Sequence, residues 1–320
     1  MEKKCGILSF FGMASLIAAA GLMPLFVGCG GKRGAVSPTS GRTKIAVGLP
    51  PVAYLVKRVG GDEVEVRTML REGRSPHDYS PGIREMRDAA SSRLFFSTGL
   101  KFEEKLARSL KRGGTRIVDV SRGIERIPME VACDHRDEHG PHDHHDEHER
   151  HGEGDPHVWL NAENACRMAE TIRDELIEAD PAHAQLYREN CRGLIVELHA
   201  CEARLKAEMA PYKGRRFYVY HPAFGYYAGM LDLHQEAFAL GGREVTVARL
   251  AEILRRAKAD NVRTVFTQPQ FNPASVRALE REHGLKVVPA DPLREDLIEN
   301  FKELGEALKA GFESDDRGKK

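Results

Sequence analysis

Residues 44–70 read KIAVGLPPVAYLVKRVGGDEVEVRTML and contain three segments of different character. The first segment, 44–49, is a short apolar run, and the third, 64–70, alternates apolar with polar residues as a β-strand does. Between them, residues 54–59 carry apolar side chains at helical spacing. A strand, a helix and a second strand in this order predict a parallel β-sheet with helices packed on its faces.

The same alternation continues along the chain, on both sides of a pair of long helical segments. In the first half, further strands are expected at 94–97 and 116–120, and helices at 83–90 and 102–111. In the second half, the expected strands are 216–220, 235–240, 262–267 and 286–289, and the expected helices are 223–231, 247–259, 273–283 and 297–312. The sequence therefore predicts an α/β fold with two separate sheets.

The two long helical segments, 162–178 and 182–209, lie between these halves, and Pro181 and Pro211 bracket the second. A helix of 28 residues is about 42 Å long, enough to reach across two lobes. We therefore expect two lobes, each a mostly parallel sheet flanked by helices, joined by a long rigid helix. The expected boundaries are 43–180 for the N-terminal lobe, 181–211 for the linking helix and 212–315 for the C-terminal lobe.

The N-terminus has the order of residues that is typical of a secretory signal. Lys3 and Lys4 precede an apolar run over 7–27, and Cys29 follows in a context that resembles a bacterial lipobox. We expect a lipoprotein signal peptide over 1–28, a lipid on Cys29 and a tether over 29–42. Phe26 departs from the usual leucine, and an uncleaved anchor helix is the alternative. Either arrangement predicts a periplasmic or extracytoplasmic location, anchored through Cys29 in the first.

The balance of charges and the absence of certain short motifs argue against several classes of protein. The 48 basic residues balance the 48 acidic ones, which disfavours a nucleic-acid partner. Motifs for phosphate binding, for a serine nucleophile and for an H-E-x-x-H zinc protease are absent from the sequence, which weakens an enzymatic interpretation. An oxidising location would permit one disulfide, although buried free thiols are an equal alternative. The cysteines concerned are Cys133, Cys166, Cys191 and Cys201.

Three histidines and one aspartate share a local context, because each lies beside a proline and just past an expected strand. They are His77, His157, His221 and Asp291. In open α/β sheets, ligands bind beyond the carboxyl ends of the strands. Two of the four segments belong to each half, so the side chains are expected to converge between the lobes. Three imidazoles and a carboxylate form a tetrahedral set that suits Zn²⁺.

A second group of histidines occupies the acidic segment 134–155. This segment holds seven of the 14 histidines and has a formal charge of −7. The composition predicts a loop that binds Zn²⁺ or similar metals weakly, with a merely solvated acidic loop as the alternative. The seven residues are His135, His139, His142, His144, His145, His148 and His151.

The mature chain resembles the ZnuA-type periplasmic zinc-binding proteins of ABC importers, a branch of the metal solute-binding protein family. The matching stretches are 76–79, 155–161, 221–227, 268–271 and 291–293. The resemblance implies that His77, His157, His221 and Asp291 hold zinc as cargo, with water as a substitute for Asp291 in some members. It also implies that the His-rich loop gathers or senses zinc. Gln268 departs from the family pattern, in which glutamate is frequent.

From these features we predict a monomeric, non-enzymatic protein that captures Zn²⁺ and delivers it to a membrane permease driven by a separate ATPase. His221 favours zinc, because the manganese-binding relatives resemble this chain but carry a carboxylate at that position. Three alternatives stay open from the sequence. They are an importer component for Mn²⁺ or Fe²⁺, a metal-dependent adhesin of the same fold, and a secreted zinc hydrolase.

Overall fold

The structure is a computed structural model that describes residues 41–71, 73–129, 154–238, 247–270, 280–281 and 283–317. These residues fall within one compact unit that runs from Ser40 to Lys320. The predicted signal peptide, Cys29, Cys133 and the seven histidines of the 134–155 segment lie outside the described residues. Most of the predicted helix 273–283 lies outside them too.

A four-stranded parallel sheet forms the N-terminal lobe. In spatial order its strands are β2 (Val64–Thr68), β1 (Thr43–Val47), β3 (Leu94–Ser97) and β4 (Arg116–Asp119). Its helices are α1 (Pro50–Gly60), α2 (Ile83–Ala89) and α3 (Lys101–Arg112). Helix α1 begins at two prolines, whose fixed φ suits a first turn, and ends before Gly61, whose φ is 56°. The chain can therefore turn back sharply into β2.

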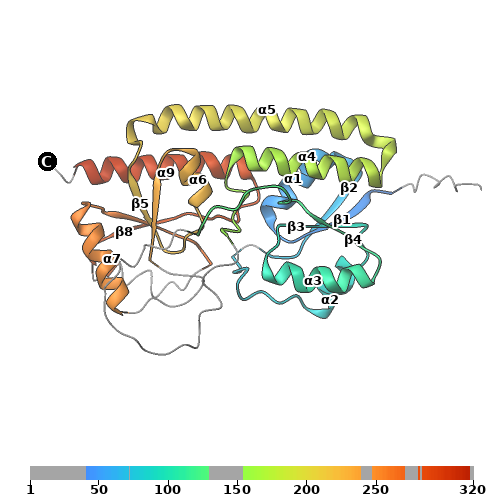
Figure 1. Cartoon of the computed structure of the whole chain (residues 1–320), viewed down its shortest axis with the longest axis horizontal. Coiled ribbons are helices and arrows are strands. Elements are labelled where there is room, and N and C mark those ends of the chain that lie inside the picture. Colours follow the sequence, from blue (N-terminus) through green and yellow to red (C-terminus); the bar gives the residue numbers. More distant parts are fainter. Residues whose placement is uncertain are drawn as a thin grey trace, which may run out of the picture. The chain divides into compact units, whose positions relative to one another are not determined.

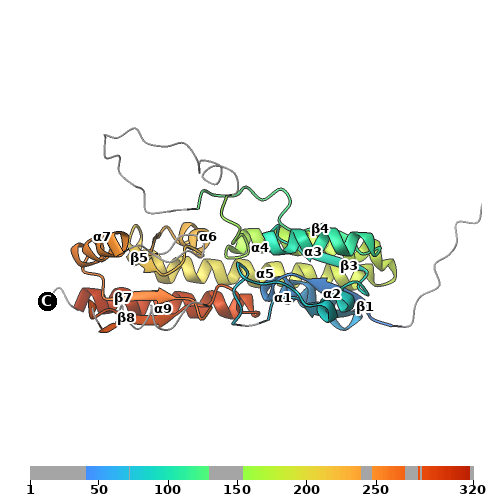
Figure 2. The same ribbon diagram turned by 90° about the horizontal axis from the view of Figure 1, so that it is seen from below.

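The C-terminal lobe repeats the same strand order in a second parallel sheet. Its strands are, in spatial order, β6 (His234–Ala237), β5 (Arg216–Val219), β7 (Thr264–Thr267) and β8 (Lys286–Pro289). Its described helices are α6 (Gly225–Met230), α7 (Val247–Ala259) and α9 (Leu297–Arg317). The two sheets and their helices are visible in Figures 1 and 2. The predicted fold class is confirmed.

A long helix, α5 (Ala184–Met209), packs against both lobes. It contacts α1 and α4 (Ala162–Ala179) on the N-terminal side and α9 on the C-terminal side (Figure 1). Its 26 residues correspond to about 39 Å of helix. It begins two residues later than the sequence predicts, because residues Pro181–His183 form a 3₁₀ turn instead.

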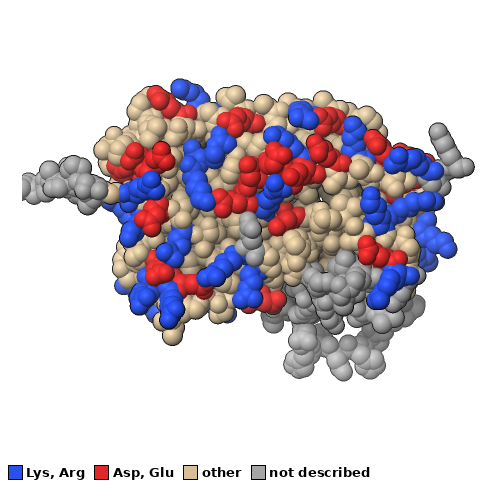
Figure 3. Space-filling model, turned by 180° about the vertical axis from the view of Figure 1, so that it is seen from behind, with Lys and Arg blue, Asp and Glu red and all other residues tan. Residues whose placement is uncertain are grey.

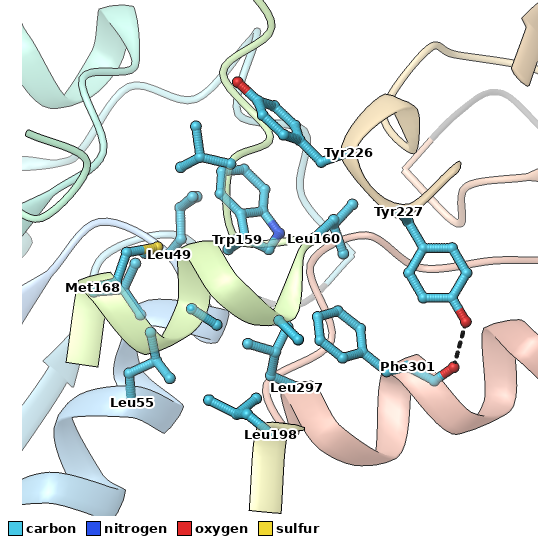
Figure 4. Packing of buried hydrophobic residues seen from close by; sticks show 14 of the residues in the cluster. Leu49, Leu55, Trp159, Leu160, Met168, Leu198, Tyr226, Tyr227, Leu297 and Phe301 are labelled. Carbon is cyan, nitrogen blue, oxygen red and sulfur yellow. Dashed lines mark hydrogen bonds between the residues drawn. The ribbon is translucent and has the colours of Figure 1, made fainter. Parts of the chain in front are cut away.

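One apolar cluster continues from the N-terminal lobe into the C-terminal lobe. Trp159 and Leu198 pack near Leu297 and Phe301 of α9 (Figure 4), and all four are fully buried. The hydroxyl of Tyr227 donates a hydrogen bond of 2.6 Å to the Phe301 carbonyl oxygen at the edge of this cluster. The lobes are therefore joined by a shared core as well as by the chain.

The three described cysteines are buried, and none is bonded to another. They are Cys166 on α4 and Cys191 and Cys201 on α5. Burial and nearby acidic side chains raise the pKa of the Cys166 thiol to about 12, which keeps it protonated. For these three residues the structure agrees with the alternative of buried thiols.

The surface carries charges of both signs. On the face shown in Figure 3, basic and acidic side chains are interspersed over the described residues. No helix within the described residues has the length and apolar character needed to span a membrane. The apolar run 7–27 lies outside the residues concerned.

Helix α3 carries a fully buried carboxyl group, Glu103, which contacts the residues that follow the two central strands of the N-terminal sheet, Gly48 after β1 and Thr98 after β3. Its Oε2 accepts hydrogen bonds from the Thr98 amide, the Thr98 hydroxyl and the Leu100 amide at 2.8, 3.1 and 3.0 Å. A Cβ at Gly48 would lie 1.7 Å from Oε1, so a larger residue there would displace the Glu103 side chain. Burial, opposed by these hydrogen bonds, raises the pKa of Glu103 to about 7.

We predict that Glu103 makes folding stability fall as pH rises from about 4.5 to about 7. In that window the folded protein binds a proton that the unfolded chain has released, so stability is lost as Glu103 ionises. Glu103→Gln keeps an acceptor and carries no charge. Its free energy of unfolding, minus that of the wild type, should increase by up to about 3 kcal/mol between pH 5 and 8.

Chemical denaturation at several pH values measures this difference, and other titrating groups cancel in it. Glu104→Gln, at an exposed neighbouring position, is the matched control and should show no such trend. A Glu103→Gln difference that stays constant from pH 5 to 8 contradicts the prediction.

Candidate metal site between the lobes

His221 lies where ligands are expected in a parallel sheet. It follows β5, and Gln268 follows the neighbouring strand β7, at the point where the strand order of the C-terminal sheet reverses. The Gln268 amide donates 2.8 Å to the His221 carbonyl oxygen and accepts 3.3 Å from the His221 amide. This two-way hydrogen bonding fixes the backbone that carries the His221 ring.

His77 lies in the loop between β2 and α2 of the N-terminal lobe. Its backbone amide donates to the Ser75 hydroxyl oxygen at 3.2 Å, which tightens the turn around Pro76. The His77 ring extends to the other lobe, and its Nε2 lies 3.4 Å from the His221 Nε2. Two residues 144 positions apart therefore meet in space.

His157 is placed differently from the sequence prediction. It does not directly follow a strand but lies in a turn just before α4, well beyond the end of β4 at Asp119. Asp155 holds this turn, because its Oδ1 accepts from the His157 amide at 2.9 Å and lies 2.7 Å from Nδ1. A carboxylate can only accept, so Nδ1 carries the proton and the Nε2 lone pair is available to a metal.

The three imidazoles line one hollow together with Gln268, Gln270 and Leu293. The ring centroids of His77 and His157 lie 5.0 and 5.5 Å from the centroid of His221. Two nitrogens bound to one tetrahedral zinc ion are about 3.3 Å apart, given Zn–N bonds of about 2.0–2.1 Å. The 3.4 Å between the His77 and His221 nitrogens fits this spacing.

The site is not fully assembled. Within the described residues, no group of three or more His, Cys, Asp or Glu side chains is arranged to hold a metal ion as it stands. The Nε2 atoms of His77 and His221 already have the separation of two zinc ligands. Completing the site would therefore require a third ligand to move closer to them. His157 faces the same hollow, with its ring centroid 5.5 Å from that of His221, and is the candidate for this third ligand.

Burial keeps two of these rings neutral. It lowers the pKa of His77, with a contribution from His157, and it lowers the pKa of His221 well below its ordinary value. Because the proton is the main competitor of a metal for imidazole nitrogen, both rings can accept a metal at neutral pH without first losing a proton.

The fourth predicted residue, Asp291, is not among the residues that line the hollow. It directly follows β8, as predicted, but its Oδ1 accepts hydrogen bonds from Gln270 Nε2 at 2.7 Å and from the Leu293 amide at 2.9 Å. Asn300 donates to its carbonyl oxygen at 2.9 Å. The structure thus brings the three histidines together and holds Asp291 beside them.

Two hydrogen bonds connect the lobes next to the ligands. Trp159 Nε1 donates 2.7 Å to the Pro292 carbonyl oxygen, and the Tyr226 hydroxyl donates 3.0 Å to the Asp155 carbonyl oxygen. The same hydroxyl accepts from the Ile127 amide at 3.2 Å. Sequence motifs alone predict no role for these residues or for Gln270. For Asp155, its position two residues before a candidate ligand was an available signal.

Comparisons with known proteins identify the family of this chain. Residues 45–311 match the family described as zinc-uptake complex component A, periplasmic (ZnuA). The zinc-binding lipoprotein AdcA of Streptococcus pneumoniae serotype 4 is 27% identical over 302 residues, which is 91% of this chain and 57% of AdcA. The chain therefore spans little more than half the length of that relative.

Solved structures give the same result. A crystal structure of ZnuA superimposes with a TM-score of 0.74 and 28% identity over 84% of this chain and 99% of that one. A zinc-bound ZnuA deletion mutant has a TM-score of 0.74 and 27% identity over 84% and 98% of the two chains. The fold and the matched region define a solute-binding protein of the transport class. Within that class, the chain belongs to the ZnuA family of periplasmic zinc-uptake components, which confirms the predicted resemblance.

We predict that removing the Asp155 carboxylate weakens metal binding, because the His157 ring loses the group that orients it. Asp155→Ala should lower zinc affinity by about 10–100-fold, the range for residues that support a ligating histidine. Asp155→Asn keeps an acceptor for both donors and should lose less. Competition with a chelator of known affinity measures both values.

Asp174→Ala on the exposed side of α4 is the control, and it should leave zinc affinity unchanged. If circular dichroism shows both proteins folded and wild type and Asp155→Ala bind zinc with equal affinity, this explanation is wrong.

Proposed function

We propose that this protein captures Zn²⁺ between its two lobes and delivers it to the permease of an ABC importer, whose energy comes from a separate ATPase. One observation carries the proposal most directly, namely the 3.4 Å between His77 Nε2 of one lobe and His221 Nε2 of the other. Membership in the ZnuA family supports the transport role. That the partners are a permease and an ATPase is inferred from the family alone, and we propose that the protein acts as a monomer.

In the proposed cargo site, His77, His157 and His221 bind the zinc ion through Nε2. The pair His77–His221 supplies the initial binding position, and His157 moves toward the ion while Asp155 keeps its Nε2 directed to the hollow. Three imidazoles favour zinc over manganese, which prefers carboxylate and water oxygens. We therefore place Mn²⁺ and Fe²⁺ behind Zn²⁺ as cargo.

We propose no chemical step on the bound ion. A zinc hydrolase needs an open metal position with a general base close to it. Neither nearby carboxylate lines this hollow: Asp155 contacts His157, and Asp291 contacts Gln270 and Leu293. Neither carboxylate is therefore placed to activate a water. The adhesin alternative is tested by a different measurement. If the protein is an adhesin, its binding to matrix should survive loss of the histidines.

The proposal predicts one tight zinc site per chain that depends on the imidazoles. His77→Ala and His221→Ala should each lower zinc affinity at least about 100-fold, because each removes a direct ligand. His199→Ala, a half-exposed histidine on α5, is the matched control and should bind as the wild type does. Chelator competition gives the affinities, and zinc analysis after dialysis gives the stoichiometry.

A variant that lacks residues 134–153 tests the His-rich segment separately. This deletion keeps Asp155, whose loss alone should weaken the site. We expect the tight site to remain and additional weak zinc binding to disappear. If tight binding is lost with the segment while His77→Ala and His221→Ala bind normally, the cargo site does not lie between the lobes.

We also propose that residues 1–28 are a signal peptide, that 29–42 form a tether and that a lipid on Cys29 anchors the chain to a membrane. The support is the order of a basic start, an apolar run and a small residue before Cys29. Cys29→Ser should move the protein from the membrane fraction to the soluble fraction of cells. Cys5→Ser, at the other cysteine of this region, is the control and should stay membrane-bound.

A further inference from the structure

The Gln270 side chain has a fixed orientation at the edge of the hollow. One end of its amide lies 2.7 Å from Asp291 Oδ1. Because a carboxylate accepts hydrogen bonds and cannot donate them, that end must be the NH₂ group. The amide oxygen Oε1 consequently lies on the other side of the amide group.

This oxygen has an unusual environment. Gln270 Oε1 is buried and has no hydrogen-bond partner among the described residues. Burying an amide oxygen without a partner costs free energy, so such an atom needs an explanation, for example a water or an ion that binds to it. Gln270 lines the hollow with His77, His157 and His221, whereas Asp291 does not.

Asp291, in contrast, is held away from this role. Its Oδ1 already accepts two hydrogen bonds, from Gln270 Nε2 and the Leu293 amide, and Asn300 Nδ2 fixes its backbone carbonyl. To bind a metal through that oxygen, Asp291 would have to give up both side-chain hydrogen bonds. Gln270 Nε2 would then lose the one hydrogen bond that it donates to a described residue.

We infer that Gln270 is a specificity-determining residue of the metal site. Its Oε1 is the oxygen that faces the bound ion, and its Nε2 holds the Asp291 carboxylate by a hydrogen bond so that this carboxylate does not bind the ion. The inference rests on the proposed zinc function of the three histidines. It assigns Asp291 to positioning Gln270 and revises the sequence-based expectation that Asp291 is a ligand.

The chemical consequence is a site with three neutral nitrogens and a neutral oxygen. Such a donor set suits Zn²⁺, whereas Mn²⁺ and other hard cations gain most from carboxylate oxygens. A neutral fourth group therefore discriminates against manganese without a change in the imidazoles. Gln268, which holds the His221 backbone, is also neutral, so neither glutamine adds a carboxylate to the hollow.

Two variants of the full chain separate the roles of Asp291 and Gln270. Asp291→Asn retains an oxygen that can accept from Gln270 Nε2 and Leu293, so zinc affinity should stay within about threefold of the wild type. Gln270→Glu places a carboxylate at the hollow, so the ratio of Mn²⁺ to Zn²⁺ affinity should rise at least about tenfold. Gln185→Glu adds the same charge on an exposed part of α5 and should change neither value.

Visible absorption of the Co²⁺-loaded proteins supplies a readout that a purely structural role does not move. We expect an unchanged tetrahedral spectrum for Asp291→Asn and an altered spectrum for Gln270→Glu. A fall in zinc affinity of more than about thirtyfold together with an altered Co²⁺ spectrum in Asp291→Asn makes Asp291 the ligand and overturns the inference. So does an unchanged metal preference in Gln270→Glu.

These outcomes are distinguishable from failure of the proposed function. If the wild type binds no zinc tightly, or if His221→Ala binds normally, the function itself is wrong, whatever the two variants do. Thermal unfolding of the metal-free variants identifies any that fail to fold. If a variant fails to fold, Gln270→Met is measured in its place. Methionine has a similar size and no amide, so this variant should release Asp291 and raise the ratio of Mn²⁺ to Zn²⁺ affinity.

Discussion

The apolar core that both lobes share is the constraint on which the metal site depends. Zinc accepts ligand nitrogens only within a narrow range of distances, so His77 and His221 are useful only if their lobes keep a fixed separation. Trp159 provides this connection, because it is buried in the shared core and donates its indole hydrogen bond to the Pro292 carbonyl oxygen of the other lobe. Helix α5 packs along the same side and extends the connection over both lobes.

The site concentrates groups that are costly to bury without a cation. Asp155 is fully buried, and its Oδ2 has no hydrogen-bond partner among the described residues. Beside it lie imidazoles whose desolvation disfavours their protonated forms. A dication bound by the rings would offset the negative charge of the buried Asp155 carboxylate, which is hydrogen-bonded to His157. Zinc bound by these rings would therefore draw part of its binding free energy from electrostatic strain in the metal-free fold, and it should stabilise the protein against unfolding.

The sequence predicts local features well and spatial meetings poorly. Strands such as 64–68 and helices such as 247–259 follow from periodicity, which is a property of neighbouring residues. The start of α5 differs from the prediction because Pro181 favours a short 3₁₀ turn, a detail that periodicity does not encode. The position of His157 and the contact between Gln270 and Asp291 depend on how loops distant in sequence meet, and only the fold determines that.

The two sheets share one strand order but use the reversal of that order differently. In the C-terminal sheet, this position carries His221 and Gln268. In the N-terminal sheet, the equivalent position is filled by the carboxyl group of Glu103, which caps Thr98 and Leu100 and lies against Gly48. With that position closed, the N-terminal lobe presents its candidate ligands, His77 and His157, from the loop after β2 and the turn before α4. The asymmetry explains why one lobe offers a rigid histidine at a strand end, while the other offers two histidines from loops that a neighbouring carboxylate and a serine hold in place.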